Sequence, residues 1–351
     1  MASKEQILEA LKQVKYPGFS RDIVSFGLVK EVDVRGADVT LHLEVTTGDA
    51  RIAEHLKQEI EKALGSLDGI ASVEIDLKVT APVQAAMQAG DLPKNPIPGV
   101  RHIIAVASGK GGVGKSTVAS NLAAAFGKMG WKVGLCDCDL YGPSIGIMFG
   151  TTDRPMINDQ EEIIPIRRHG LSLMSMSFLV EEEAPVILRG PMVTRYTQQF
   201  LRSVAWGELD VLVLDLPPGT GDIQLTIVQT VSLSGAVVVS TPQEVALIDA
   251  RKAVAMFNKV NVPILGLVEN MSYFLCPDNG KRYDLFGHGG GRKEAERQNV
   301  PLLAEVPIEM EARQASDEGM PVVLKSPESA SAKAFQQLAD ALQLILKLKA
   351  S

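Results

Sequence analysis

Short, nearly continuous apolar runs recur through the last two thirds of the chain, and segments with helical spacing lie between them. The clearest runs are residues 103–107, 133–136, 211–214, 236–239 and 264–268. Strands that are buried on both faces have this pattern, because neither face needs polar side chains. One intervening helix is predicted over 116–129, where Gly130 ends it. We therefore expect an α/β fold with a doubly wound, mostly parallel sheet, which binds ligands at the carboxyl ends of its strands.

The N-terminal part of the chain has shorter elements, which are typical of a small α/β unit. Apolar residues at helical spacing predict helices over 7–14 and 52–64. Runs that are rich in β-formers, or that alternate in polarity, predict strands over 23–32, 39–45 and 71–79. A unit of this size can fold alone, although its small core gives it marginal stability.

A proline-rich segment separates these two patterns. Pro93, Pro96 and Pro98 remove backbone donors and restrict their neighbours, which favours an extended connector. The sequence therefore predicts three parts: a small α/β domain (1–82), a linker (83–99) and a larger α/β domain (100–351).

Charge and composition narrow the class of protein. The formal net charge is −7, from 35 basic and 42 acidic residues, whereas gripping a nucleic-acid backbone needs a basic face. No run approaches the roughly 18 apolar residues of a membrane-spanning helix, and the first residues show no signal-peptide core. The three cysteines, Cys136, Cys138 and Cys276, are too few for a secreted disulfide framework. We expect a cytoplasmic protein without nucleic-acid or membrane partners.

A glycine-rich loop follows the first apolar run and opens the predicted helix. It reads Gly-Lys-Gly-Gly-Val-Gly-Lys-Ser over residues 109–116 and fits the pattern G-x-x-x-x-G-K-[ST]. Glycines let successive N–H groups turn inward around a phosphate, and the helix presents its positive end. Lys115 is expected to neutralise the β- and γ-phosphates, and the Ser116 hydroxyl to ligate Mg²⁺. The residues expected to bind nucleotide in this phosphate loop are Gly109, Lys110, Gly111, Gly112, Val113, Gly114, Lys115, Ser116 and Thr117.

Carboxylates follow two further apolar runs and are expected to converge on the same crevice. Asp137 and Asp139 follow the second run, and Asp215 follows the third. We assign Asp215 to Mg²⁺, directly or through water. Asp137 is assigned to orienting the attacking water, with Asp139 as second choice; capping or loop hydrogen bonding is the equal alternative for Asp139. Residues 217–221, called the switch loop below, are expected to sense the γ-phosphate.

Lys110 is unusual, because an ordinary phosphate loop needs no cation at its second position. Gly-Lys-Gly-Gly-Val-Gly-Lys-Ser resembles the deviant Walker A motif of the MinD, ParA and nitrogenase iron-protein class. The resemblance implies a nucleotide-sandwich homodimer in which Lys110 reaches the partner's phosphates and acts in catalysis beside Lys115; a solvated loop charge is the alternative. It also implies that Asn270 meets an adenine base, and hence ATP. The guanine-binding pattern Asn-Lys-x-Asp is not met at 258–261, which is interpreted as a helix end.

Longer segments narrow this resemblance. Residues 137–144, 215–222 and 269–274 together resemble the Mrp/ApbC branch, and residues 16–29 are similar to the small iron–sulfur assembly domain that often precedes it. Members of this branch are iron–sulfur cluster carriers with weak ATPase activity, and they work as homodimers. The resemblance therefore implies a P-loop NTPase fold for the larger domain. Apoprotein clients and iron–sulfur assembly proteins are the implied partners.

One departure from the family concerns its cluster ligands. Members usually have Cys-x-x-Cys after Asn-Met-Ser-Tyr-Phe, so that a homodimer brings four thiolates to one bridging [4Fe–4S] cluster. Here Cys276 fits the first ligand, but Asn279 takes the second position, and an amide cannot replace a thiolate on iron. Cys276 is thus a candidate iron–sulfur ligand, with a free thiol in a turn as the equal alternative. Cys136 and Cys138 flank Asp137 and are interpreted as small apolar core residues.

The leading hypothesis is an ATP-hydrolysing carrier that delivers iron–sulfur clusters to apoproteins. The alternatives are a positioning or regulatory ATPase of the MinD/ParA kind, and an assembly adaptor that holds no cluster itself. The predicted last helix, 334–348, has few cations on its polar face, which favours a core helix over a membrane-binding one. His288 lacks ligand spacing and is not assigned to a metal.

Overall fold

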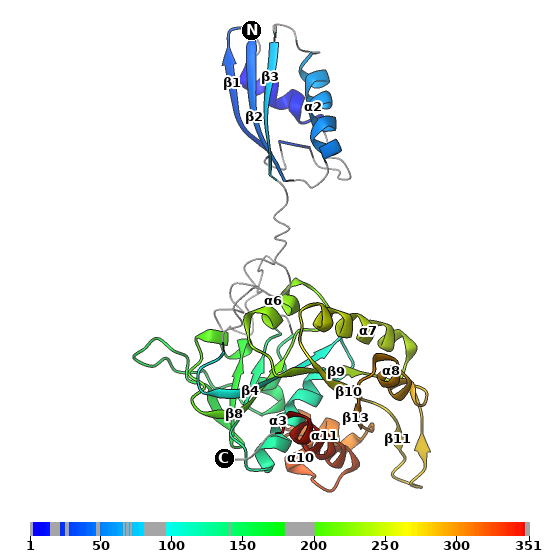
Figure 1. The fold of residues 1–351 in the computed structure, drawn as a ribbon. Helices are drawn as coiled ribbons and strands as arrows, with labels where there is room; N and C mark the ends of the chain where they lie inside the picture. The colour runs from blue at the N-terminus through cyan, green and yellow to red at the C-terminus, as the bar shows by residue number, and fades with distance from the viewer. Residues whose placement is uncertain are drawn as a thin grey trace. The chain divides into compact units, whose positions relative to one another are not determined.

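A computed structural model describes residues 3–14, 22–24, 28–46, 50–65, 67, 70, 72–80, 96–139, 142–179 and 201–347 (Figure 1). The chain divides into two compact units, residues 1–88 and 89–351, and each is described by itself. The expectations for residues 16–18, 25–27, 83–95 and 140–141 lie outside the described residues. In the described part of the chain, no helix has both the length and the apolar content needed to cross a membrane.

The N-terminal unit is a three-stranded sheet packed against two helices. β1 (Val29–Arg35) pairs antiparallel with β2 (Asp38–Thr46), and β2 pairs in parallel with β3 (Ser72–Thr80). The helices are α1 (Lys4–Leu11) and α2 (Ala50–Gly65). Apolar residues from both helices and from the sheet form a hydrophobic core that belongs to this unit alone.

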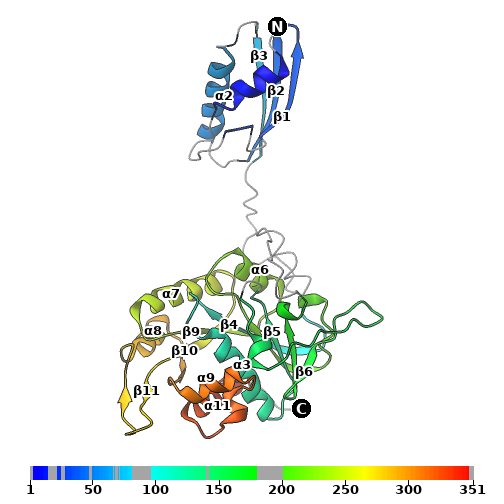
Figure 2. The same cartoon turned by 180° about the vertical axis from the view of Figure 1, so that it is seen from behind.

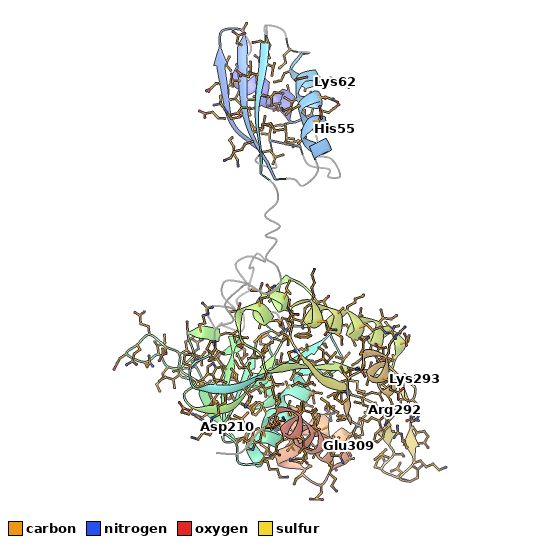
Figure 3. All side chains as sticks on the ribbon, viewed as in Figure 1. His55, Lys62, Asp210, Arg292, Lys293 and Glu309 are labelled. Carbon is orange, nitrogen blue, oxygen red and sulfur yellow. The ribbon has the colours of Figure 1, made fainter. Side chains whose placement is uncertain are left out.

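Alternating polarity explains why the helices cover only one face of this sheet. Leu41 and Leu43 of β2 are buried, whereas His42 between them is partly exposed. On α2, the exposed side chains of His55 and Lys62 point away from the strands (Figure 3). The sheet and the helix therefore each contribute one apolar face to the core.

The first strand of this unit begins later than the sequence predicts. The composition of residues 23–32 indicated a strand, but β1 begins at Val29. Ile23 is fully buried, and its N–H donates to the Val14 carbonyl at 3.0 Å, so it packs beside the end of α1 instead of pairing with β2. The prediction of this strand's start was wrong because apolar residues in a buried turn have the same composition as a strand.

The larger unit is built on an eight-stranded sheet, and the prediction of a doubly wound, mostly parallel sheet is confirmed. The strand order is β13-β10-β9-β4-β8-β5-β7-β6. Of the strand pairs that the structure describes in this sheet, β6–β7 is antiparallel and the others are parallel. All five predicted apolar runs lie in its strands, whereas β6, β7 and β13 were not predicted. The strands are β4 (Val100–Ser108), β5 (Val133–Asp137), β6 (Ile166–Arg168), β7 (Leu171–Ser175), β8 (Leu209–Asp215), β9 (Gly235–Ser240), β10 (Ile264–Glu269) and β13 (Leu302–Glu305).

Helices cover both faces of this sheet (Figures 1 and 2). α3, α10 and α11 pack together on one face, and α7 and α8 pack together on the other, with α6 beside α7. A 3₁₀ helix spans Met176–Phe178. The α-helices are α3 (Lys115–Lys128), α4 (Ile145–Met148), α6 (Asp222–Thr230), α7 (Glu244–Lys259), α8 (Gly290–Gln298), α9 (Met310–Asp317), α10 (Val322–Lys325) and α11 (Ala330–Leu346).

The last helix packs into the core, as its apolar stripe predicted. Phe335, Leu338 and Leu342 of α11 are buried, and the helix lies against α3 and β13. Leu344 and Ile345, near the end of the helix, are 79% and 42% exposed, so the apolar residues of its last turn lie outside the core.

The central strand β4 carries the phosphate loop to the place where the winding of the sheet reverses. β4 lies between β9 and β8, and the chain leaves it towards β5 on one side and reaches β9 later on the other. Such a reversal leaves a crevice at the carboxyl ends of the strands. Asp137 of β5 and Asp215 of β8 stand opposite each other in register at this end. The fold therefore brings the loop and both carboxylates to one edge.

At its start, the phosphate loop approaches the backbone of α7 so closely that only glycine fits. A Cβ built on Gly109 would lie 2.0 Å from the Asp249 carbonyl oxygen, whereas one built on Gly111 would meet nothing within 4 Å. We predict that Gly109→Ala lowers the free energy of unfolding of the nucleotide-free protein by about 1–3 kcal/mol, because the loop and the helix must separate.

Gly111→Ala is the matched control, and its effect on stability should stay within about 0.5 kcal/mol. Thermal denaturation of both variants, followed by circular dichroism without nucleotide, measures the difference. Equal melting temperatures for the two variants would show that the loop does not depend on this contact.

Candidate functional site

The phosphate loop is shaped by its glycines and by the strand and helix at its two ends. Gly112 and Gly114 have φ values of 81° and 77°, which L side chains rarely adopt. Ser108 Oγ donates to the Lys110 carbonyl at 2.8 Å, which closes the first turn of the loop. Gly114 then caps α3, whose first residue is Lys115. The loop thus ends at a helix N-terminus, where backbone N–H groups are available to an anion.

Lys115 and Asp215 form a buried ion pair at the centre of the site. Lys115 Nζ donates to Asp215 Oδ1 and, at 3.3 Å, to Ser116 Oγ. The side chains of Lys115 and Asp215 are 7% and 0% exposed. Burial raises the pKa of Asp215, and the Lys115 charge offsets part of that rise. The pair ties the first turn of α3 to the end of β8.

The other carboxylate oxygen of Asp215 shows that this site suits a cation. Asp215 Oδ2 is buried and has no hydrogen-bond partner among the described residues. Mg²⁺ prefers oxygen ligands, and Asp215 with the nearby Ser116 hydroxyl supplies such a set. The residues therefore fit the predicted Mg²⁺ site. Across the described ranges, this site included, no group of three or more His, Cys, Asp or Glu side chains is arranged to hold a metal ion.

Asp137 organises the loop that follows β5. Its Oδ1 accepts from the Asp139 N–H at 3.1 Å. Its Oδ2 accepts from the N–H groups of Ser144 and Ile145 at 2.9 and 3.2 Å, and from Ser175 Oγ at 3.3 Å. With four donors on its two oxygens and no exposed surface, Asp137 has little capacity left to hold a water.

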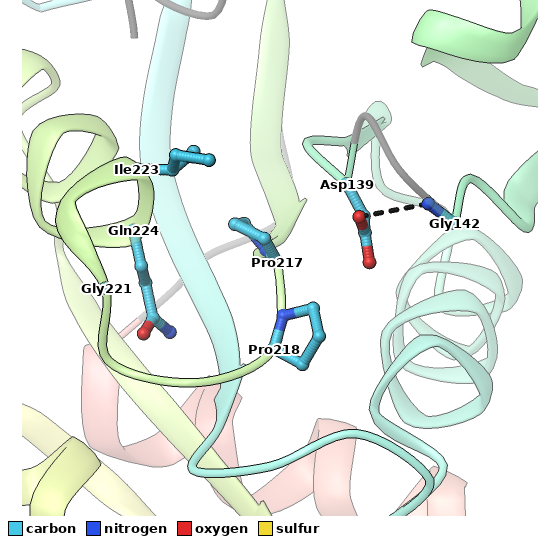
Figure 4. A pocket seen from close by; sticks show the side chains of 7 residues that line it. All are labelled: Asp139, Gly142, Pro217, Pro218, Gly221, Ile223 and Gln224. Carbon is cyan, nitrogen blue, oxygen red and sulfur yellow. Dashed lines mark hydrogen bonds between the residues drawn. The ribbon is translucent and has the colours of Figure 1, made fainter. Parts of the chain in front are cut away.

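Asp139 lies beside a cavity between this loop and the switch loop. The Gly142 N–H donates to Asp139 Oδ1 at 3.2 Å, and the side chain is half-buried. Asp139 therefore has access to a space that Asp137 lacks. The cavity has a volume of about 420 Å³ and is lined by Asp139, Gly142, Pro217, Pro218, Gly221, Ile223 and Gln224 (Figure 4).

The polar and glycine positions of the phosphate loop differ in exposure. Gly111 and Gly112 are exposed, and Lys110, Ser116 and Thr117 are half-buried. Within the described ranges, the Lys110 ammonium group has neither a hydrogen bond nor an ion pair. A cation without a partner on its own chain is compatible with a role towards phosphate.

Asn270 is hydrogen-bonded to the backbone of the phosphate loop. Its Nδ2 donates to the Val113 carbonyl at 2.8 Å, and its N–H donates to the Ser240 carbonyl at 2.8 Å. Asn270 is 6% exposed, and a Cβ built on Gly114 would lie 2.1 Å from its Nδ2. The structure therefore brings Asn270 to the loop, and its contact with adenine stays a prediction.

Cys276 starts the turn of a small hairpin formed by β11 (Phe274–Leu275) and β12 (Arg282–Tyr283). The Cys276 N–H donates to the Lys281 carbonyl at 2.9 Å, and the thiol is free and half-buried. Asn279 is exposed in the same turn, where its Oδ1 accepts from the Lys281 N–H at 2.9 Å. Cys276 and position 279 therefore share one short turn.

Cys136 and Cys138 lie within the main hydrophobic core. Both are fully buried, with their sulfur atoms 4.0 Å apart. Burial raises the pKa of the Cys136 thiol, which keeps it protonated. These features support their interpretation as small apolar residues rather than ligands.

Sequence reasoning missed two polar side chains at this site, Ser175 and Gln224. Ser175 ends β7, a strand whose pattern was not recognised, and it contacts Asp137 from there. Gln224 is 1% exposed and lines the cavity. One signal could have found Gln224: the buried residues Ile227 and Val228, three and four positions later, place it on the inner face of α6.

Comparison with known proteins decides the family. Residues 99–343 match the family model ParA, described as NUBPL iron-transfer P-loop NTPase. The chain belongs to this family. Residues 4–77 match a second model, described as iron-sulfur cluster assembly protein. Both matches confirm the resemblance that the motifs predicted.

Individual relatives agree with this assignment. The chain is 44% identical over 339 residues to the iron-sulfur cluster carrier protein of Deinococcus radiodurans, a match that covers 96% of this chain and 94% of the relative. Among solved structures, a nucleotide-binding protein from Archaeoglobus fulgidus in complex with ADP is 40% identical. Its TM-score is 0.59 over 67% of this chain and 92% of that chain. MinD from Pyrococcus horikoshii, complexed with Mg-ADP, is 26% identical with a TM-score of 0.53, over 69% and 95% of the two chains.

The nucleotide-free protein should lose stability as the pH rises through the titration of Asp137. Burial, followed by the charge of Asp215, raises the pKa of Asp137 from 3.8 to about 7. A carboxyl with a raised pKa binds its proton more tightly in the folded chain, so its stabilising effect is complete below about pH 4 and is lost towards pH 7. We predict a decline of at most about 1.4 kcal/mol per pH unit from this group.

Urea titrations of the full chain at several pH values measure this decline. Trp131 and Trp206 both lie in the larger unit's core, so their fluorescence follows that unit. Asp137→Asn removes the titrating group and should flatten the decline, while it lowers stability at every pH because an amide cannot accept from all four donors. The same pH dependence in the variant and in the native chain would contradict the assignment.

Proposed function

We propose that this protein is an ATP-hydrolysing carrier that delivers iron–sulfur clusters to apoproteins, and that it acts as a cytoplasmic homodimer. The names of its family and of its relatives support this role. Its own phosphate loop, Mg²⁺ ligand set and cysteine hairpin supply the parts that the role needs. We retain the division into a small α/β domain (1–82), a linker (83–99) and a P-loop ATPase domain (100–351).

The observation that carries the proposal is the segment that joins the nucleotide site to the thiol. β10 ends at Glu269, and the next residue, Asn270, donates to the phosphate loop. Cys276 follows six residues beyond Asn270. Between them, the Tyr273 carbonyl accepts from the Ile308 N–H at 2.7 Å and fixes the segment to the body of the unit. The phosphate loop and Cys276 are therefore joined by one short, anchored segment.

In this proposal ATP binds with its phosphates at the N-terminus of α3, along residues 109–117, and with its adenine near Asn270. Lys115 exchanges Asp215 for the β- and γ-phosphates, which carry more negative charge than one carboxylate. Ser116 and Asp215 hold Mg²⁺, which when bound neutralises charge on the phosphate oxygens. Asp215 thereby keeps a positive partner after Lys115 has turned away.

Asp139, rather than Asp137, is our candidate for orienting the attacking water. Asp139 lines the cavity beside the switch loop, whereas Asp137 accepts four hydrogen bonds. One of those bonds comes from the Asp139 N–H, so in this proposal Asp137 positions Asp139, which orients the water. This order reverses the one that the sequence suggested.

Lys110 is our candidate for a contact across the homodimer. Its ammonium group has no partner among the residues that the structure describes, and it stands on the loop that holds the phosphates. A second cation on the γ-phosphate stabilises the charge that develops during phosphoryl transfer. The proposal thus needs two copies of the chain for efficient hydrolysis.

Cys276 is our candidate cluster ligand, and the two protomers bring two such thiolates. A [4Fe–4S] cluster bridging them would need further ligands, because Asn279 supplies none. That departure favours a second candidate function, an adaptor that docks apoproteins and assembly proteins without holding a cluster. The match of residues 4–77 to an assembly-protein family supports a docking role for the N-terminal unit in either case.

The hydrolytic roles can be separated with two substitutions. Asp139→Asn keeps the shape of the side chain but removes its charge, so we predict a turnover number for ATP lowered about 10²–10⁴-fold, with the ATP-dependent dimer intact. Lys110→Gln should lose both turnover and dimer. Phosphate release and light scattering, the latter with a non-hydrolysable ATP analogue, measure the two properties. Normal turnover in Asp139→Asn would return the role to Asp137, and a normal dimer in Lys110→Gln would remove Lys110 from the interface.

The cluster role can be tested by taking a thiolate away and by adding one. After anaerobic reconstitution with iron and sulfide, Cys276→Ser should bind no iron above background. Asn279→Cys doubles the thiolates of a dimer from two to four, so it should retain more iron and sulfide and release them more slowly to a chelator. Asn279→Ser is the matched control, since it changes the same turn without adding a thiolate. A colourless native protein, with no gain in Asn279→Cys, would favour the adaptor.

A further inference from the structure

Buried polar atoms without partners occur on both sides of the switch loop, in Asp215 before it and in Gln224 after it. In the described part of the chain, Asp215 Oδ2, Ser144 Oγ and both polar atoms of the Gln224 amide are buried and make no hydrogen bond. Two further atoms of this kind, in Ser172 and Trp206, lie elsewhere in the unit. Folded proteins pair nearly all buried polar groups, so such atoms mark a place where partners arrive with a ligand or with a change of conformation. Asp215 is explained by Mg²⁺, and Gln224 is not.

Gln224 holds both a donor and an acceptor inside the protein. It is the third residue of α6, directly after the switch loop, and it is 1% exposed. It also lines the cavity with Asp139, and in Figure 4 its amide extends towards the switch-loop backbone between Pro218 and Gly221. A leucine or methionine would fill this position on the inner face of α6 without burying an unpaired amide. Packing alone therefore gives no reason for a glutamine.

The switch loop is hydrogen-bonded to the end of β4 in this structure. The Gly219 N–H donates to the Ser108 carbonyl, at the end of β4, at 3.0 Å. Pro217 and Pro218 have no N–H, so the donors of the loop are limited to residues 219–221. A γ-phosphate that attracted these N–H groups would break the bond to Ser108 and move the loop relative to α6. Gln224 lines the same cavity as Pro217, Pro218 and Gly221, so its amide lies beside the loop that would move.

We propose that Gln224 is the positioning residue that lets the switch loop recognise a triphosphate. When the loop closes on a γ-phosphate, the Gln224 Oε1 accepts from a loop N–H and its Nε2 donates to a loop carbonyl. The amide then gains partners only in the triphosphate state, and it favours ATP over ADP. This inference rests on the proposed ATP-dependent function and deepens it by naming the residue that reads the third phosphate.

The inference predicts opposite effects on two quantities. The unpaired amide lowers the stability of the nucleotide-free protein, and the same amide raises the affinity for a triphosphate once the loop has closed. Gln224→Met keeps the length of the side chain and removes both polar atoms. The melting temperature of the nucleotide-free protein should therefore stay the same or rise. The dissociation constant for ADP should not change. The dissociation constant for the slowly hydrolysed analogue ATPγS should rise about 5- to 30-fold, the value of one or two hydrogen bonds.

Gln229→Met is the matched control, because Gln229 is on the same helix, is half-buried and does not line the cavity. It should change none of the three quantities. Amide hydrogen exchange adds a local readout: ATPγS should protect residues 219–221 in the native chain and protect them less in Gln224→Met. Gln224→Leu provides a second apolar variant, with the same expected pattern.

The outcomes are distinct. If Gln224→Met lowers the melting temperature and weakens ADP and ATPγS equally, the glutamine is structural and the inference is overturned. If the variant binds both nucleotides as the native chain does, Gln224 does not sense the third phosphate, and the inference fails while ATP binding stands. If the native chain binds neither nucleotide, the proposed function is wrong, and the inference that rests on it is wrong as well.

Discussion

The buried pair of Lys115 and Asp215 sets the conditions under which the rest of the site works. Both side chains are withdrawn from water, so neither charge is stable there without the other. Removing one partner would leave a buried charge without compensation, at a cost of about 3–5 kcal/mol. Because the pair joins the start of α3 to the end of β8, it also fixes the phosphate loop against the strand that ends at Asp215.

A triphosphate has to replace this arrangement and not merely add to it. If Lys115 turns to the phosphates, Asp215 needs another cation, which is a physical reason for nucleotide and Mg²⁺ to bind together. Asp137 stands in register with Asp215, and the charge of Asp215 helps to raise its pKa. A cation beside Asp215 would therefore also favour ionised Asp137 and strengthen its hold on the Asp139 loop. The charge states of Asp215 and Asp137 therefore depend on each other.

The elements that could be predicted from the sequence are those whose pattern lies in a short, continuous segment of the chain. The central strands are buried on both faces, so their apolar runs needed no tertiary information, and the glycine-rich loop is contiguous. β7 was not predicted because serines interrupt the apolar pattern of its five residues. β6 was not predicted because its three residues are too few to show a pattern. The sequence ordered Asp137 before Asp139 for the attacking water, and the bonds on which we base the reverse order could not be read from it. They include the N–H groups of Ser144 and Ile145, which come from residues further along the chain.

The end of β10 leads in the chain to the residue that bonds the phosphate loop and then to the hairpin that carries Cys276. Glu269 is buried, and its Oε2 accepts from the Gly291 N–H at the start of α8, so this residue is fixed to the body of the unit. Asn270 is instead bonded to the phosphate loop, and Met271 has a φ of 54°, which turns the chain sharply away from the sheet. Between Asn270 and Cys276, the Ser272 N–H donates to the Val306 carbonyl at 2.9 Å, and the Tyr273 carbonyl accepts from the Ile308 N–H at 2.7 Å. The segment that bonds the phosphate loop is therefore anchored to the chain just after β13, and it sets the position of the hairpin that carries Cys276.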